Sequence, residues 1–79
     1  MLQYPENANK TEKLLEEAIQ EETDPKRRDR LTSIYNNITL CKEAIIKINS
    51  KRHLEILLPR ELKKAEKELN IKLEDLIKK

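Results

Sequence analysis

An apolar repeat between residues 31 and 48 constrains the fold of this chain more than any other feature of the sequence. Six apolar residues recur at alternating steps of three and four: Leu31, Ile34, Ile38, Cys41, Ile45 and Ile48. Such steps place side chains on one face of an α-helix, whereas a half-buried strand would place them at every second position. The repeat therefore predicts a long helix with one apolar face that something must cover.

The residue types in the chain favour an all-α fold. The 79 residues include no glycine, no phenylalanine and no tryptophan, and 41% of them are charged. Hairpins depend on glycine and strands favour aromatic and β-branched residues, whereas Leu, Glu, Lys and Arg lose little side-chain freedom in a helix. One cysteine excludes an internal disulfide, and one histidine with one cysteine cannot form a structural zinc site. We therefore expect a small domain stabilised by helix packing or by self-association.

Turn and capping residues divide the chain into a flexible leader, residues 1–8, and a single helical domain, residues 9–79. Asn9 can cap a first helix over residues 10–22. In "TDP", Asp24 is a suitable cap and Pro25 suits the first helical position, which starts a second helix over residues 25–49. The third helix is expected over residues 59–77, where the apolar stripe consists of Leu62, Ala65, Leu69, Leu73 and Leu76. Because a short connection makes neighbouring helices antiparallel, the pattern predicts a three-helix antiparallel bundle.

Opposite charges flank the first expected turn. Glu21 and Glu22 end the first helix, and Lys26, Arg27 and Arg28 follow at the start of the second. Each group is unfavourable for the dipole of its own helix, so we expect the helices to fold back and the two groups to neutralise each other. The alternative is a phosphate-binding patch and a nucleic-acid-binding regulator, with these candidate residues: Lys26, Arg27, Arg28, Arg30, Lys51 and Arg52.

Helix lengths predict that part of the apolar repeat stays uncovered. The first helix is expected to span roughly 20 Å and the second roughly 37 Å at the usual rise per residue. The first helix then cannot reach the second half of the repeat, which either the third helix or a second copy could cover. An uncovered stripe is typical of a docking surface or dimer seam. The expected interface residues are Cys41, Ile45, Ile48, Leu54 and Leu57.

These patterns favour a small intracellular, non-enzymatic protein–protein interaction or regulatory module that docks helices, with a homodimer or another protein as its partner. We expect no catalytic, metal-binding or cofactor-binding residues: Cys41 lies on the apolar face, and His53 follows two cations. No apolar run reaches the ~18 residues that span a membrane, and the N-terminus does not resemble a secretory signal. A single cysteine is consistent with the reducing cytoplasm.

The stretch "HLEILLPREL", residues 53–62, has two interpretations. Together with "LNIKLEDLIKK", residues 69–79, it resembles the ribbon-helix-helix family of DNA-binding regulators over the last third of the chain. The resemblance implies a strand before Pro59 whose side chains read bases in the major groove. Alternatively, Leu54, Leu57 and Leu58 share one face of a short helical turn, and the chain extends at Leu58 because a proline follows. We expect the helical corner, since leucines offer no hydrogen bonds to base edges.

Overall fold

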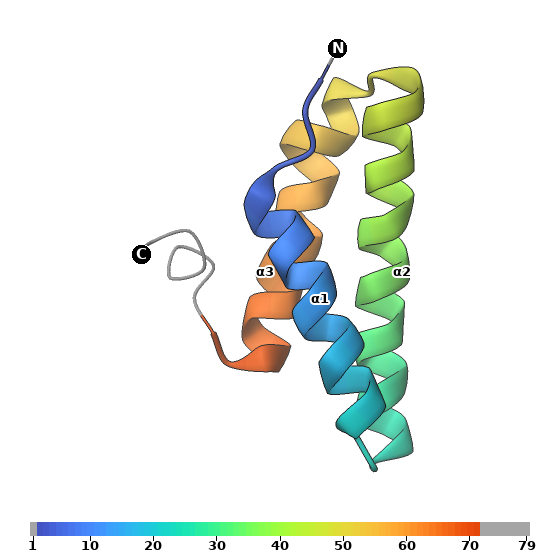
Figure 1. Cartoon of the computed structure of the whole chain (residues 1–79), viewed down its shortest axis with the longest axis vertical. Coiled ribbons are helices and arrows are strands. Elements are labelled where there is room, and N and C mark those ends of the chain that lie inside the picture. Colours follow the sequence, from blue (N-terminus) through green and yellow to red (C-terminus); the bar gives the residue numbers. More distant parts are fainter. Residues whose placement is uncertain (1, 72–79) are drawn as a thin grey trace.

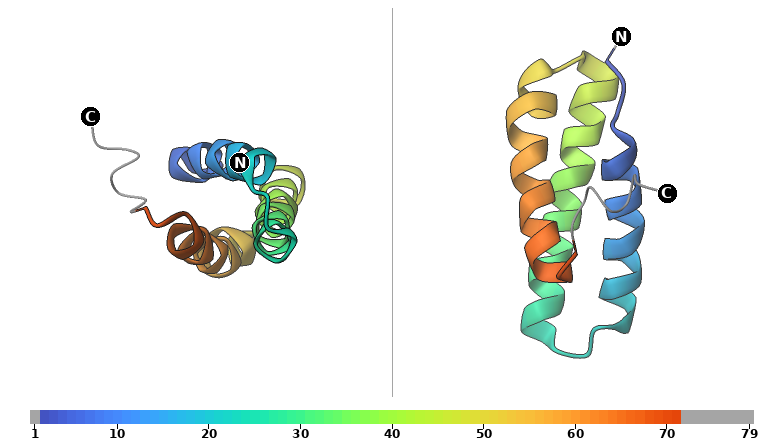
Figure 2. Two further views of the ribbon diagram at one scale, coloured as in Figure 1. Left: turned by 90° about the horizontal axis from the view of Figure 1, so that it is seen from below. Right: turned by 90° about the vertical axis from the view of Figure 1, so that its left-hand side faces the viewer.

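The computed structural model describes residues 2–71 and shows a three-helix antiparallel bundle, with no strand among these residues. Helix α1 spans Glu6–Glu21, α2 spans Pro25–Ile48 and α3 spans Leu58–Leu69, and a π-helical turn, η1, occupies His53–Leu57. Each of the three helices contacts the other two. The longest helix, α2, runs along the long axis of the bundle (Figure 1). Seen from one end, the three helices form an open triangle (Figure 2). The predicted all-α, three-helix class is therefore confirmed.

The N-terminal residues belong to the bundle. Helix α1 begins at Glu6, and Leu2 and Tyr4 pack against the buried core. The backbone N–H of Leu2 donates a hydrogen bond to Asn49 Oδ1 at 3.1 Å, and Lys42 Nζ lies 5.3 Å from the centre of the Tyr4 ring. Helix α1 thus begins four residues before the expected position, and the side chain of Leu2 and the ring of Tyr4 occupy partly buried sites beside α2.

The hairpin between α1 and α2 follows from the residues of its turn. Asp24 caps α2 by accepting a hydrogen bond from Lys26 N–H at 3.1 Å, and Pro25 occupies the first helical position, where no N–H is needed. Across the hairpin, Leu15 of α1 and Leu31 and Ile38 of α2 are fully buried. Thr11 is also fully buried, and its hydroxyl is satisfied by donating to the carbonyl of Asn7 at 2.6 Å. The predicted second helix is reproduced to within one residue.

The chain reverses after α2 at Asn49, not before Pro59. Asn49 has a left-handed backbone (φ 51°), which asparagine tolerates better than most residues, and Ser50 then caps a helical stretch by accepting from His53 N–H at 3.3 Å. Leu58 is α-helical (φ −60°, ψ −47°) and not extended. The expected bend at Leu58 is therefore wrong, whereas the helical interpretation of residues 53–57 is confirmed and the strand expected from the resemblance is absent there.

The π-helical turn explains how a helix continues through Pro59. Proline cannot donate to the carbonyl four residues before it, and its ring clashes with that carbonyl in a regular α-helix. Here the N–H of Leu58 donates to the carbonyl of His53, five residues earlier, so the turn preceding the proline is wider than an α-turn. The widening lets residues 53–69 run as one nearly continuous helical stretch antiparallel to α2 (Figure 1).

Helix α3 ends earlier than its apolar stripe predicts. Asn70 is left-handed (φ 56°), and the N–H of Ile71 donates to the carbonyl of Glu66 at 3.1 Å, which is the pattern of a Schellman cap. Leu69 and Ile71 pack against the core on either side of this turn. The helix expected over residues 59–77 therefore stops at Leu69, and Leu73 and Leu76, on which the longer helix depended, lie outside the described residues.

Candidate functional site

The structure divides the five predicted interface residues between the interior and the surface. Cys41 is 4% exposed and Ile45 is fully buried within one chain, Leu54 and Leu57 are half-buried, and Ile48 is 71% exposed. The expectation that one chain leaves the second half of the repeat uncovered is therefore wrong for Cys41 and Ile45. Both η1 and α3, which begin earlier than the predicted third helix, contact α2, and Leu2 and Tyr4 pack against the same core. Of the five predicted interface residues, only Ile48 is a mostly exposed apolar side chain.

A new apolar stripe appears on the outer side of α2. Leu40 is 62% exposed and Ile48 is 71% exposed, and Ala44 lies midway between them. These three residues, the outer stripe, are four positions apart, so they form one ridge along the helix surface. Leu40 is not part of the apolar repeat, so the repeat did not predict it as an interface residue. A large apolar residue one position off such a repeat is the signal that could have revealed it.

A hollow lies next to the outer stripe, between α2 and the π-helical turn. It has a volume of about 310 Å³ and is lined by Asn37, Leu40, Cys41, His53, Leu57 and Glu61. Asn37 donates to Glu61 at 3.1 Å, so two residues of the lining join α2 to α3. The wide turn of η1 contributes His53 and Leu57 to the wall. Turns of this kind occur often at functional sites, and here the turn shapes a concave surface beside exposed apolar side chains.

The polar groups of the hollow have structural partners. Burial, followed by the nearby negative charge of Glu61, raises the pKa of the Cys41 thiol, so the reactive thiolate is disfavoured. His53 Nδ1 lies 2.6 Å from the hydroxyl of Ser50, the residue that also caps the start of the helical stretch. Among residues 2–71, no three His, Cys, Asp or Glu side chains are placed to hold a metal ion.

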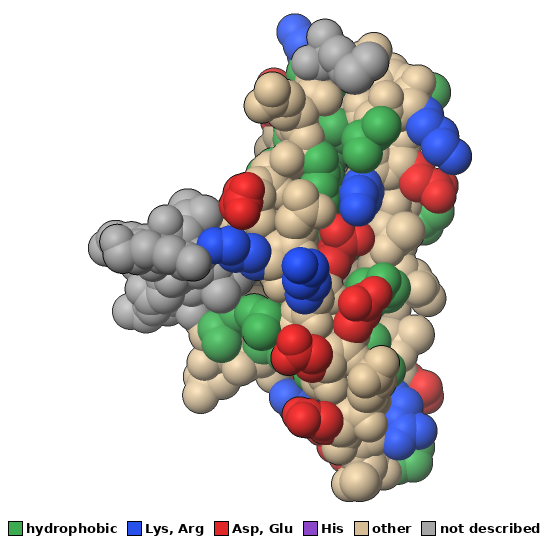
Figure 3. All heavy atoms as spheres, in the orientation of Figure 1, with side chains coloured by type: hydrophobic (Ala, Val, Ile, Leu, Met, Phe, Trp, Pro, Cys, Tyr) green, Lys and Arg blue, Asp and Glu red, His purple; other side chains and the backbone are tan. Residues whose placement is uncertain are grey.

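The six candidate nucleic-acid-binding residues do not lie on a single surface. The N-terminal end of α2 carries Lys26, Arg27, Arg28 and Arg30, whereas its C-terminal end is followed by Lys51 and Arg52. A helix of 24 residues separates the two groups by roughly 36 Å. The face shown in Figure 3, with α1 in front, likewise carries alternating acidic and basic side chains with no broad area of one sign.

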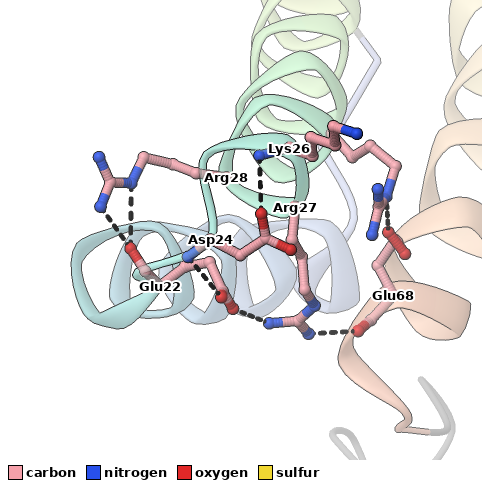
Figure 4. Close-up of polar contacts among 7 residues, drawn as sticks. Glu22, Asp24, Lys26, Arg27, Arg28 and Glu68 are labelled. Carbon is pink, nitrogen blue, oxygen red and sulfur yellow. Dashed lines mark hydrogen bonds and ion pairs between the residues drawn. The ribbon is translucent and has the colours of Figure 1, made fainter.

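The arginines at the first end of α2 are engaged within the chain (Figure 4). Arg27 forms an ion pair with Glu22 and donates to the carbonyl of Glu68 at 2.7 Å. Arg28 donates to the carbonyl of Glu22 at 3.1 Å, and Arg30 pairs with the Glu68 carboxylate at 2.7 Å. The hydrogen bond from Arg27 is the main reason that the pKa of Glu22 is lowered. The expected neutralisation of opposite charges across the hairpin is thus present.

Comparison with known proteins adds no relative: the chain matches no protein-family model, no curated protein and no solved structure. Any function must therefore be inferred from the side chains and surfaces of this chain. None of the helices within residues 2–71 is long and apolar enough to cross a membrane.

Proposed function

We propose that this protein is a small, non-enzymatic interaction module that docks an apolar helix of a partner against the outer stripe and the adjoining hollow. The observation that carries the proposal is the exposure of Leu40 and Ile48, at 62% and 71%, on one ridge of a helix whose opposite side is fully packed. Their exposure cannot stabilise the isolated chain. Exposed apolar side chains beside a concave surface are typical of a protein-binding site.

The rigid setting of the stripe supports docking by preformed surfaces. On its inner side, α2 is held by the fully buried Ile38 and Ile45 and by Cys41, so the outer stripe stands on a packed helix. The hollow is bordered by the π-helical turn, and the Asn37–Glu61 hydrogen bond joins two of its lining residues. A surface that is already ordered loses less conformational entropy on binding than a flexible segment does.

Nucleic-acid binding is the weaker proposal. Phosphate contacts need cations that can leave their protein partners, and Arg27, Arg28 and Arg30 are all engaged with Glu22 or Glu68. Lys51 and Arg52 remain exposed at the opposite end of the bundle, but two cations offer only a small electrostatic footprint.

The test compares two substitutions that add the same charge at exposed isoleucines. Ile48→Asp alters the outer stripe, whereas Ile56→Asp alters a side chain that is 48% exposed and lines neither the stripe nor the hollow. Wild type, Ile48→Asp and Ile56→Asp are immobilised as three baits. We expect partner proteins to bind wild type and Ile56→Asp but not Ile48→Asp, and each such partner is then purified and titrated against all three baits. Equal binding by all three baits in the titration would refute the docking surface.

A further inference from the structure

We propose that the partner of the outer stripe is the same stripe of a second copy of this chain, crossing it in an antiparallel sense with the two-fold axis beside Ala44. This inference rests on the proposed function, because it names the occupant of the surface proposed there. It follows from three properties of the described residues: the spacing of the stripe, the position of the hollow and the charges on one flank.

The stripe is symmetric about its central residue. Leu40 and Ile48 each lie four positions from Ala44, which corresponds to roughly 6 Å along the helix axis in either direction. A two-fold axis beside Ala44 therefore brings Leu40 of one copy opposite Ile48 of the other, and this contact occurs twice. The small side chain of Ala44 at the crossing lets the two helices approach to the usual 8–10 Å. Ridges of residues four apart pack in this manner in the commonest class of helix crossing.

The hollow provides a site for the opposing side chain. It lies beside Leu40 and shares that residue as part of its wall. In the antiparallel arrangement, Ile48 of the second copy is the side chain that arrives at Leu40, and the hollow of about 310 Å³ has room for it. The same chain thus carries both the projecting isoleucine and the hollow that receives it. Such self-complementarity is the defining property of a closed, two-fold interface.

The charges on one flank of the stripe are also complementary to themselves. Glu43 and Lys47 are exposed neighbours on the same flank, and no ion pair of either residue is found among residues 2–71. A two-fold axis beside Ala44 keeps this flank on one side of the interface, so Glu43 of each copy meets Lys47 of the other. A parallel arrangement would place like residues opposite each other and would lose both pairs.

Sedimentation equilibrium of the full chain over a range of concentrations tests the pairing. Wild type should form a dimer. Ile48→Asp or Leu40→Asp should raise the dissociation constant of the dimer by at least about tenfold, since each removes two apolar contacts per dimer. Ile56→Asp is the matched control and should associate as wild type does. A wild type that stays monomeric up to about 1 mM would overturn the pairing. So would an equal loss of dimer in Ile56→Asp.

Two further measurements test the antiparallel arrangement. Glu43→Lys and Lys47→Glu should each weaken the dimer, and the double substitution should restore it, because the pairs re-form with reversed polarity. Ala44→Cys should form an interchain disulfide on mild oxidation, whereas Glu17→Cys, on the exposed face of α1, should not. The arrangement would be overturned if the double variant dimerised more weakly than both single variants, or if Ala44→Cys formed no crosslink.

The outcomes for self-pairing and for the proposed function are separable. If wild type is monomeric but a different purified protein binds it and not Ile48→Asp, the second copy is the wrong occupant and the docking surface stands. If wild type dimerises and Ile48→Asp dimerises equally well, pairing through the stripe fails, and the docking surface fails too if every purified partner binds Ile48→Asp as tightly as wild type. Circular dichroism of each variant at low concentration shows whether the helices are retained, and Ile48 is suited to substitution because it contributes little to the interior.

Discussion

Ile45 and Ile48 occupy equivalent positions in the sequence repeat, yet the structure predicts opposite consequences for truncating them. Ile45 is fully buried in the core of the bundle, whereas Ile48 is 71% exposed at the last residue of α2. Replacing each by valine removes one methylene group and keeps the β-branched shape. The pair of variants therefore compares burial alone, at two residues that are otherwise alike.

The expected magnitudes differ severalfold. A buried Ile→Val substitution costs about 0.5–1.5 kcal/mol, because the lost contacts leave a small cavity. Less than a third of Ile48 is buried, so the same change there should cost only about 0.2 kcal/mol on the scale of ~0.8 kcal/mol per buried methylene. A domain of this size has a total stability of roughly 3–5 kcal/mol, so Ile45→Ala, at about 2–5 kcal/mol, would leave much of the chain unfolded.

Urea denaturation followed by the helical circular dichroism signal measures this difference. With a slope of about 1 kcal/mol/M, Ile45→Val should lower the midpoint by about 0.5–1.5 M and Ile48→Val by about 0.2 M. The protein must be dilute, since dimerisation would stabilise the folded state and make the result for Ile48 depend on concentration. Equal shifts for the two variants at low concentration would refute the division of the repeat into an inner and an outer part.

Three further measurements test local features. Asn70→Ala should lower the free energy of unfolding by about 1 kcal/mol and Asn70→Gly should not, since only alanine is strained at φ 56°; urea denaturation of both variants checks this. The raised pKa and burial of Cys41 should make its labelling by a thiol reagent near neutral pH far slower in the native than in the unfolded chain, and equal rates would contradict its position. The lowered pKa of Glu22 should stabilise the fold above its ordinary value of 4.5, and this contribution should disappear as pH falls through the lowered value. Glu22→Gln should therefore be less stable than wild type at neutral pH and equally stable in strong acid, and a difference that does not vary with pH would contradict the Arg27 contact.

Local signals in the sequence predicted most of the helical architecture. The spacing from Leu31 to Ile45 defined the inner face of α2, and the Asp24–Pro25 pair located its start, because capping and the missing proline N–H act within one turn. The charges of Glu22 and Arg27 predicted the hairpin, since helix dipoles make their separate positions unfavourable. Each of these effects depends on residues a few positions apart.

The candidate site was less predictable because it depends on where distant segments meet. Spacing alone does not show that Ile45 is covered while Ile48 is exposed, since that difference is set by the path of residues 53–58. Pro59 suggested a bend, and the local preference of the residue before proline was overridden by a π-helical turn that keeps Leu58 helical and buried. Asn70 ended α3 although leucines continue beyond it, because a left-handed asparagine can terminate a helix without glycine.

The π-helical turn also sets a register that a change in chain length would alter. A turn closed by a bond over five residues holds one more residue than an α-helical turn. Deleting Glu55 would remove that extra residue and rotate the preceding segment by about 100° relative to α3. Lys51 to His53 would then point in new directions while the α1–α2 hairpin kept its own packing. Length variation at this one position would therefore redirect the wall of the hollow without changing a single residue of the buried core.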